Sequence, residues 1–305
     1  QLGSPAYYFL FFAHQLAEMA IPSFLFVSGF FITFAARGNK SGLTWEMVLL
    51  RSKKLIAPFV IWTVIFVTLE LVANVRTFTL NWLYLLQRYY YIPLIIQLYF
   101  LSPYLINLAK KNWKLLLLGT ALVQFGTQAL RHTIYLGLDF PGRNLLIDLT
   151  PVWLFPGHLF YFSIGIYAGL YLEDFSRWIR RYKWFLLASG ILLLCITAAE
   201  YQVVAIFAGK DWLGYAFSPL SRNFFAVTIM LSFLAFDFQP PYSEKLSLLG
   251  SKSLGIYLVN MPAMFLFAVF LYYVAPKLLG YQIVLQVVFF LAGGDLIQHF
   301  FGDGH

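Results

Sequence analysis

The sequence predicts an all-α membrane protein, a polytopic bundle of transmembrane helices, and three observations lead to this fold class. Of the 305 residues, 61% are hydrophobic and only 11% are charged, and the mean hydropathy is +0.74. Soluble domains carry about 25% charged residues, so a chain this apolar could not cover its own surface in water. Apolar runs near spanning length also recur along the whole chain, and short basic clusters separate them.

The apolar runs give the expected helices in order. Nine runs approach or exceed the roughly 20 residues that a helix needs to cross the hydrocarbon core. They are residues 6–36, 55–73, 92–109, 114–131, 157–172, 184–203, 222–237, 253–274 and 281–301. No soluble domain interrupts them, so we expect a single transmembrane domain over residues 1–305.

The basic residues in the connections predict the orientation of these helices. Alternate connections hold 14 of the 21 Lys and Arg residues, at 37–54, 110–114, 173–183 and 238–252, and the intervening ones hold seven. Cytoplasmic loops are the ones enriched in Lys and Arg. The richer set is therefore predicted in the cytoplasm, with Gln1 outside and the C-terminus inside. An extracytoplasmic start leads us to expect one further helix before residue 1.

The net charge of +8 does not indicate nucleic-acid binding. The basic clusters lie beside membrane spans, where they orient helices and meet anionic headgroups. We therefore expect membrane lipids as partners and no nucleic acid. The single cysteine, Cys195, excludes an intrachain disulfide. Asp295, His299 and Asp303 have helical spacing, but a terminal segment leaving the membrane explains them, and we expect no metal.

Three different motifs follow one another along the chain. They are AIPSFLFVSGFFI at 20–32, RSKKLIAPFVIW at 51–62 and LLGSKSLGIYLVNMP at 248–262. In order and spacing they resemble the integral-membrane acyltransferase-3 family. Residues 89–105 and 158–173 are similar to further parts of that family, so the resemblance extends over nearly the whole chain.

The resemblance implies a ten-helix bacterial membrane enzyme. Such a protein moves an acyl group, usually acetyl, from cytoplasmic acyl-CoA to a hydroxyl of an extracytoplasmic glycan, lipid or small acceptor. The resemblance implies acetyl-CoA as the donor and the cytoplasmic membrane as the location of the enzyme. A transporter or export component for a glycan or lipid-linked glycan is the alternative, because buried polar groups suit both. A non-catalytic homologue is a third, since Asn260 stands where the family often has a histidine.

The catalytic residue is not assigned within this sequence. The family's Arg and His pair is expected upstream of residue 1, because no Arg precedes His14. His14 and Glu18, one helical turn apart, are the alternative. A histidine oriented by a carboxylate can deprotonate a hydroxyl, but both side chains could instead lie at the outer membrane face.

Two groups of residues are candidates for binding the donor and the acceptor. Arg51 and Lys54, at the cytoplasmic start of a predicted helix, suit the phosphates of coenzyme A, whereas Lys53 is expected only to orient the helix. On the predicted outer side the polar candidates are Arg88, His132, Arg143 and His158, with Tyr161 and Tyr90 as aromatic neighbours. Aromatic rings can stack on sugars, although Tyr and Trp are enriched at every membrane interface.

Four further polar or small residues within or near the spans have weaker functional readings. Ser28 and Gly29 lie deep in an aromatic run. We expect this small pair to allow close approach of another helix, in preference to a role for Ser28 as a nucleophile. Glu200 and Gln97 are weaker candidates for a polar site.

Overall fold

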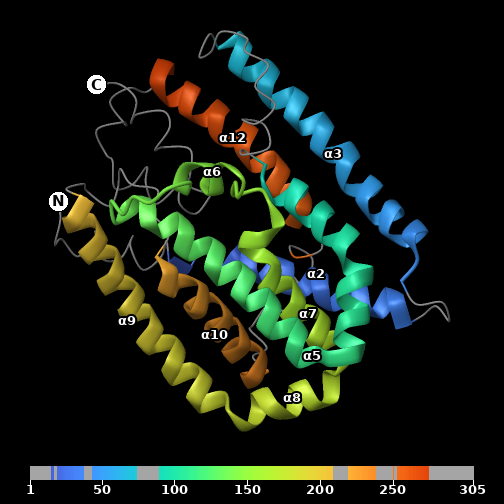
Figure 1. Ribbon diagram of the computed structural model, residues 1–305. Coiled ribbons are helices and arrows are strands. Elements are labelled where there is room, and N and C mark those ends of the chain that lie inside the picture. The colour runs from blue at the N-terminus through green and yellow to red at the C-terminus, as the bar shows by residue number, and fades with distance from the viewer. Residues whose placement is uncertain are drawn as a thin grey trace. The chain divides into compact units, whose positions relative to one another are not determined.

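The computed structural model describes residues 15–16, 19–37, 43–73, 89–208, 219–237, 250 and 253–274. Every regular element in these ranges is helical, so the predicted all-α class is confirmed (Figure 1). The chain divides into two units. Unit 1 comprises residues 1–14, 54–89 and 239–305, and unit 2 comprises residues 15–53 and 90–238.

The elements follow the predicted apolar runs along the chain. They are α2 (Ala20–Arg37), α3 (Trp45–Val72), α5 (Tyr91–Tyr135), α6 (Arg143–Asp148), the 3-10 turn η1 (Phe155–His158), α7 (Leu159–Leu170), α8 (Leu172–Arg181), α9 (Lys183–Ala208), α10 (Leu220–Phe236) and α12 (Ser253–Val274). Within the described ranges, α3, α5, α9 and α12 are long and apolar enough to cross a membrane, while α2 and α10 are shorter apolar helices.

The structure refines the expected helix boundaries in three places. The runs 92–109 and 114–131 both lie within α5. Helix α3 begins at Trp45, ten residues before the predicted run at 55, so it includes the basic cluster at 51–54. The connection 173–183 contains a helix, α8. The run 281–301 lies outside the described residues.

Helix α5 consists of two limbs joined at Asn112, whose backbone is not helical (φ −157°, ψ 90°). The Asn112 side-chain oxygen accepts a hydrogen bond from the Leu115 backbone N–H at 3.0 Å. This is the geometry of an N-cap, which satisfies a donor that the first turn of a helix leaves unpaired. The second limb therefore starts as a new helix, and we call residues 109–115 the α5 bend.

Helices α2 and α7 form the closest-packed pair in unit 2. A Cβ atom built at Gly29 would clash with the carbonyl oxygen of Phe162, and one built at Gly165 would clash with that of Phe26. Small residues let two backbones approach this closely, as in many membrane helix pairs. Later in both helices, a Cβ atom built at Gly169 would clash with Thr33. Later residues of α2 therefore meet later residues of α7, so the two helices run parallel. Gly29 has the packing role that its sequence context favours.

The buried core of unit 2 joins α2 and α7 to three further helices. Its members are Phe26, Ile164, Ala168, Phe175, Ile179, Leu186, Met230, Leu231 and Ala235. They come from α2, α7, α8, α9 and α10, so side chains far apart in sequence share one apolar cluster. Packing of this kind, not a hydrophobic driving force alone, holds helices together in lipid.

Unit 2 has two polar ends, which we call the bend end and the cluster end. The bend end holds the α5 bend, α8 and the α10 C-terminus. Tyr171 marks it, donating a hydrogen bond to the Ala109 carbonyl at 3.2 Å. The cluster end holds the far ends of both α5 limbs, η1, the α9 residues around Glu200 and the start of α10. Connections predicted on opposite sides of the membrane thus lie at opposite ends of unit 2.

Unit 1 has a small aromatic core of its own. The Tyr89 hydroxyl donates to the Leu258 carbonyl of α12 at 3.2 Å. The Phe66 ring of α3 lies edge-on to Tyr89 and Phe265, with centroids 6.3 and 5.8 Å apart. These three side chains are fully or almost fully buried, and they hold α12 to the second half of α3.

Candidate functional site

A segment at the cluster end, residues 150–158, which is irregular apart from the 3-10 turn η1, is held by polar side chains of α5. Gln97 on the first limb donates to the Trp153 carbonyl at 2.9 Å and accepts from the Phe155 N–H at 3.2 Å. Irregular backbone at membrane depth is tolerated only where protein satisfies its polar groups. Gln97 performs that role here, and we call residues 150–158 the strap.

The second limb of α5 contributes three more contacts to the strap and the start of α7. Arg131 donates to the Thr150 carbonyl, Gln128 to the Gly157 carbonyl at 3.0 Å, and Gln124 accepts from the Phe160 N–H at 2.9 Å. The spacing of 124, 128 and 131 places all three on one helical face. Both limbs of α5 therefore hydrogen-bond to the same stretch of backbone, residues 150–160.

Two buried N–H donors near the strap have no hydrogen-bond partner among the described residues. They are the side-chain amide nitrogen of Gln124 and the indole nitrogen of Trp153. A buried donor without a partner costs about 1–3 kcal/mol. The cluster end therefore has donors that an oxygen-rich molecule can satisfy.

His158 and Tyr161, both predicted acceptor residues, lie together at the cluster end. His158 closes η1, and its ring lies 6.2 Å from Tyr90 in a stacked arrangement and 6.4 Å from Tyr161. Tyr161 is 2% exposed and donates to the side-chain oxygen of Asn223 at 2.6 Å. Asn223 in turn donates to the Leu220 carbonyl at 3.2 Å. These bonds connect α7 to the first turn of α10.

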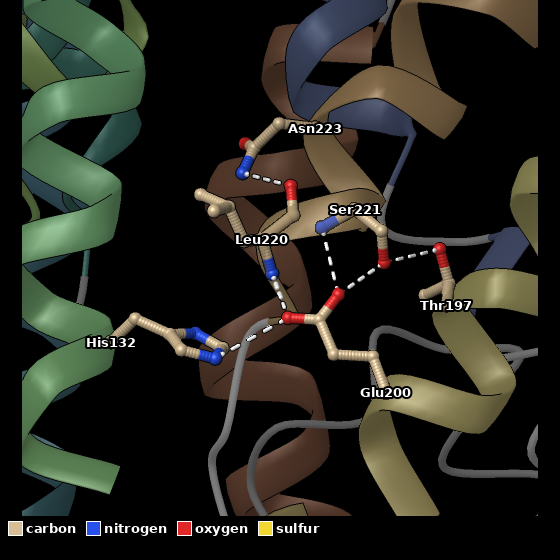
Figure 2. Close-up of polar contacts among 6 residues, drawn as sticks. All are labelled: His132, Thr197, Glu200, Leu220, Ser221 and Asn223. Carbon is tan, nitrogen blue, oxygen red and sulfur yellow. Dashed lines mark hydrogen bonds and ion pairs between the residues drawn. The ribbon is translucent and has the colours of Figure 1, made fainter. Parts of the chain in front are cut away.

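Glu200 forms a second polar network on the same turn of α10 (Figure 2). Its carboxylate accepts hydrogen bonds from the backbone N–H groups of Leu220 and Ser221, at 2.7 and 2.9 Å. It also accepts from the Ser221 hydroxyl, which lies 3.1 Å from the Thr197 hydroxyl. Negative charge is favourable at a helix N-terminus, where backbone N–H groups are unpaired. A side chain of α9 thus caps α10.

His132 connects this network to α5. Its Nε2 lies 3.4 Å from a Glu200 oxygen, and the two side chains are 13% and 20% exposed. The carboxylate stands between the serine and the histidine, so a proton leaving Ser221 would pass to Glu200. In a serine nucleophile relay the histidine occupies the middle position. The arrangement is therefore a polar clasp between three helices and not a nucleophilic triad.

The other predicted residues lie apart from this cluster or outside the described ranges. Arg143 begins α6, where it donates to the Leu138 carbonyl at 2.5 Å and pairs with Asp139 at 3.7 Å. Arg51 and Lys54 lie on α3, three residues apart, with Arg51 partly buried and Lys54 exposed. Because α3 begins at Trp45, they lie inside this helix and not at its start as predicted. His14, Glu18 and Arg88 lie outside the described residues.

Several cluster residues received no role from sequence reasoning, although signals for them exist. Gln124 and Gln128 interrupt an apolar helix at i, i+4 spacing, and Ser221-Arg222-Asn223 is a polar run at a helix start. Arg222 and Asn223 are both largely buried. Polar groups in a span generally face the protein interior, so these interruptions mark the inner faces of α5 and α10. Within the described ranges, no group of three His, Cys, Asp or Glu side chains is placed to hold a metal ion.

Comparison with known proteins identifies the family. Among curated proteins and among solved structures, no match to this chain is found. One protein family, described as the acyltransferase domain of the acyltransferase-3 type, matches residues 2–294. That match spans both units and nearly every residue of the sequence. The chain therefore belongs to the acyltransferase-3 family of membrane proteins.

Proposed function

We propose that the protein is a membrane O-acyltransferase that uses cytoplasmic acyl-CoA, with acetyl-CoA as the most suitable donor. The acceptor is a hydroxyl of a glycan, lipid or small molecule on the other side of the membrane. The observation that carries this proposal is the family match over residues 2–294. Donor and acceptor occupy opposite sides, which is the physical reason for placing such an enzyme in a bundle of spanning helices.

The polar cluster supports the placement of the acceptor. Gln124 and Trp153 supply buried donors, and His158, Tyr161 and Asn223 supply rings and polar atoms around the first turn of α10. Hydroxyl-rich molecules are bound by convergent polar groups and by aromatic faces. We place the acceptor here, with Arg143 and Arg88 as charged residues of the same predicted outer side.

The donor is assigned to the basic segment within α3. Arg51 and Lys54 share one helical face, and charged side chains of this kind bind phosphate oxygens with strong hydrogen bonds. In the reaction, the acceptor oxygen bonds to the thioester carbonyl carbon, the carbon–sulfur bond breaks, and coenzyme A leaves as the thiol. The hydroxyl proton passes to a base, which then delivers it to the departing sulfur. The proposed base is the histidine that the family resemblance implies, with His14 oriented by Glu18 as the alternative.

The proposal is tested with inside-out vesicles, which present the cytoplasmic face to added substrate. Acetyl-CoA labelled in the acetyl group is supplied outside, and label is followed into lumenal glycan and lipid. We expect transfer, reduced at least tenfold in Arg51→Gln/Lys54→Gln with a raised KM for acetyl-CoA. Lys53→Gln, one residue away, is the matched control and should retain the donor KM.

Two outcomes would change this assignment. Absence of transfer from any acyl-CoA, with folded protein in the vesicles, would contradict the proposal and favour the transporter alternative. Loss of transfer in His14→Ala would make His14 the base, whereas full activity in that variant would make it peripheral.

A further inference from the structure

The bend end of unit 2 carries a dense group of exposed cations that the proposed reaction does not use. Three belong to the α5 bend and four belong to α8 and the start of α9. They are Lys110, Lys111, Lys114, Arg177, Arg180, Arg181 and Lys183. All are exposed except Lys183, which is partly exposed. We call these seven residues the basic platform.

The platform has two arms, the α5 bend and α8 with the start of α9. Packing holds these arms side by side. The Tyr171 hydroxyl, at the start of α8, donates to the Ala109 carbonyl beside the α5 bend at 3.2 Å. The Trp113 ring of the bend lies 4.8 Å from the Tyr167 ring of α7. Phe175 and Ile179 bury the apolar face of α8 in the core of unit 2, so its basic face points outward.

Acidic neighbours neutralise only part of this charge. Arg177 lies 3.6 Å from Asp174, and Arg180 lies 3.7 Å from Asp237, in pairs whose side chains are 65–78% exposed. Exposed pairs of this kind contribute little and are screened by salt. Glu173, on α8, is the third acidic residue at this surface. The seven cations therefore exceed these three acidic residues by four.

The surroundings of the platform place it at the level of lipid headgroups. Exposed apolar side chains begin directly beside the cations, with Leu115 and Leu118 on α5 and Phe185 on α9 at 54%, 61% and 69% exposure. Exposed indole rings, such as those of Trp178 and Trp184, lie among the cations. Trp at the boundary of an apolar band marks a membrane–water interface. The platform therefore lies where hydrocarbon gives way to headgroups.

We propose that the basic platform is a binding surface for anionic phospholipid headgroups, with α8 lying in the plane of the interface. Each phosphate would meet two or more cations from the α8 and α5 arms, and the acyl chains would lie along the exposed apolar faces of α5 and α9. A simple orientation signal needs only the number of cations. A binding surface additionally requires a saturable preference for anionic lipid that depends on these side chains. The proposal does not rest on the acyltransferase activity.

The test measures the lipids retained by the purified protein. The protein is equilibrated with equimolar phosphatidylglycerol and phosphatidylcholine of matched chains, and bound lipid is counted by native mass spectrometry. A basic residue near an anionic surface contributes about fivefold in affinity. We therefore expect phosphatidylglycerol to be preferred by about fivefold or more, with the preference falling at high salt.

Two sets of variants make the preference specific to the platform. Arg177→Gln/Arg180→Gln/Arg181→Gln and Lys110→Gln/Lys111→Gln/Lys114→Gln should each lower it at least twofold. Arg177→Lys/Arg180→Lys/Arg181→Lys, which keeps the charge, should retain it and shows that α8 still folds. The matched control, Glu173→Gln/Asp174→Asn/Asp237→Asn, removes three charges of opposite sign from the same surface and should raise the preference.

Three results would overturn the proposal. Equal retention of both lipids, or a preference unchanged in both neutralised variants, would reduce the platform to an orientation signal. Loss of phosphatidylglycerol on adding coenzyme A, but not on adding inorganic phosphate at the same phosphate concentration, would instead make the platform a nucleotide site for the donor.

Discussion

The carboxylate of Glu200 accepts hydrogen bonds from two backbone N–H groups and one hydroxyl, and it lies beside the imidazole of His132. Hydrogen bonds to a charged group contribute about 1.5–3 kcal/mol each, more than neutral ones. At this site a single side chain sets where α10 begins and how far it lies from α9 and α5.

The substitution Glu200→Gln should destabilise unit 2 by about 2–3 kcal/mol, because the new amide presents N–H donors where donors already point. Ser221→Ala should cost about 1 kcal/mol, since the Ser221 backbone N–H still bonds to Glu200. Thermal unfolding in detergent measures the order of the two. Equal effects would mean that the carboxylate is not the centre of the network.

Tyr161→Phe tests the link between α7 and α10. It removes the bond to Asn223 at 2.6 Å and leaves a buried acceptor unpaired, which costs about 1–3 kcal/mol. Under the proposed function the acceptor KM should rise several-fold while the acetyl-CoA KM stays unchanged. A parallel rise in both constants would assign Tyr161 to packing alone.

Among the elements, the α2–α7 pair depends most on small side chains. Gly165→Ala should destabilise by about 1–3 kcal/mol, because the new Cβ meets the Phe26 carbonyl oxygen and the helices must separate. Gly119→Ala is the matched control on α5, where nothing lies within 4 Å of the added Cβ. That change should be neutral or stabilising by about 0.5–1 kcal/mol. Thermal unfolding of both variants decides, and equal effects would contradict the close approach.

At the same scale, the sequence predicted most helices well and their breaks less well. Apolar runs located α2, α7, α9, α10 and α12, because burial in lipid requires long stretches without charge. The α5 bend was expected as a separate connection between 109 and 114. A single non-helical residue, Asn112, is enough to turn the chain there. Helix α8 escaped prediction because its two buried residues, Phe175 and Ile179, are too few to form an apolar run.

The candidate site was predicted only in part. His158 and Tyr161 were selected by residue type and side of the membrane, and their ring centroids lie 6.4 Å apart. Their partner Asn223 lies 62 residues away along the chain from Tyr161. The Glu200–Ser221 bond joins residues 21 apart on different helices. Such pairings depend on how the helices pack, which hydropathy and loop charge do not encode.

For the whole molecule, the distribution of 14 and seven basic residues predicts which end of unit 2 faces the cytoplasm. In a Cys195→Ala background, needed because Cys195 is exposed, a single cysteine replaces Asp139 or Glu173. A membrane-impermeant maleimide on intact cells should label Asp139→Cys, whose native side chain is 81% exposed beside Arg143. Glu173→Cys should react only after permeabilisation. The reverse pattern would invert the orientation and move the proposed acceptor site to the cytoplasm.

The hydrogen bonds between α5 and the strap also indicate where the polypeptide can be split into two parts. Residues 136–142 are not helical and are exposed. The segments on either side of them are joined by hydrogen bonds from Arg131, Gln128, Gln124 and Gln97. Helix α7 additionally packs on α2, which precedes the division. Two polypeptides separated near Asp139 should therefore find each other in the membrane and reassemble. The same stretch is the natural place for an inserted epitope or reporter, because its residues are exposed and the segments on either side of it are joined by hydrogen bonds of their own.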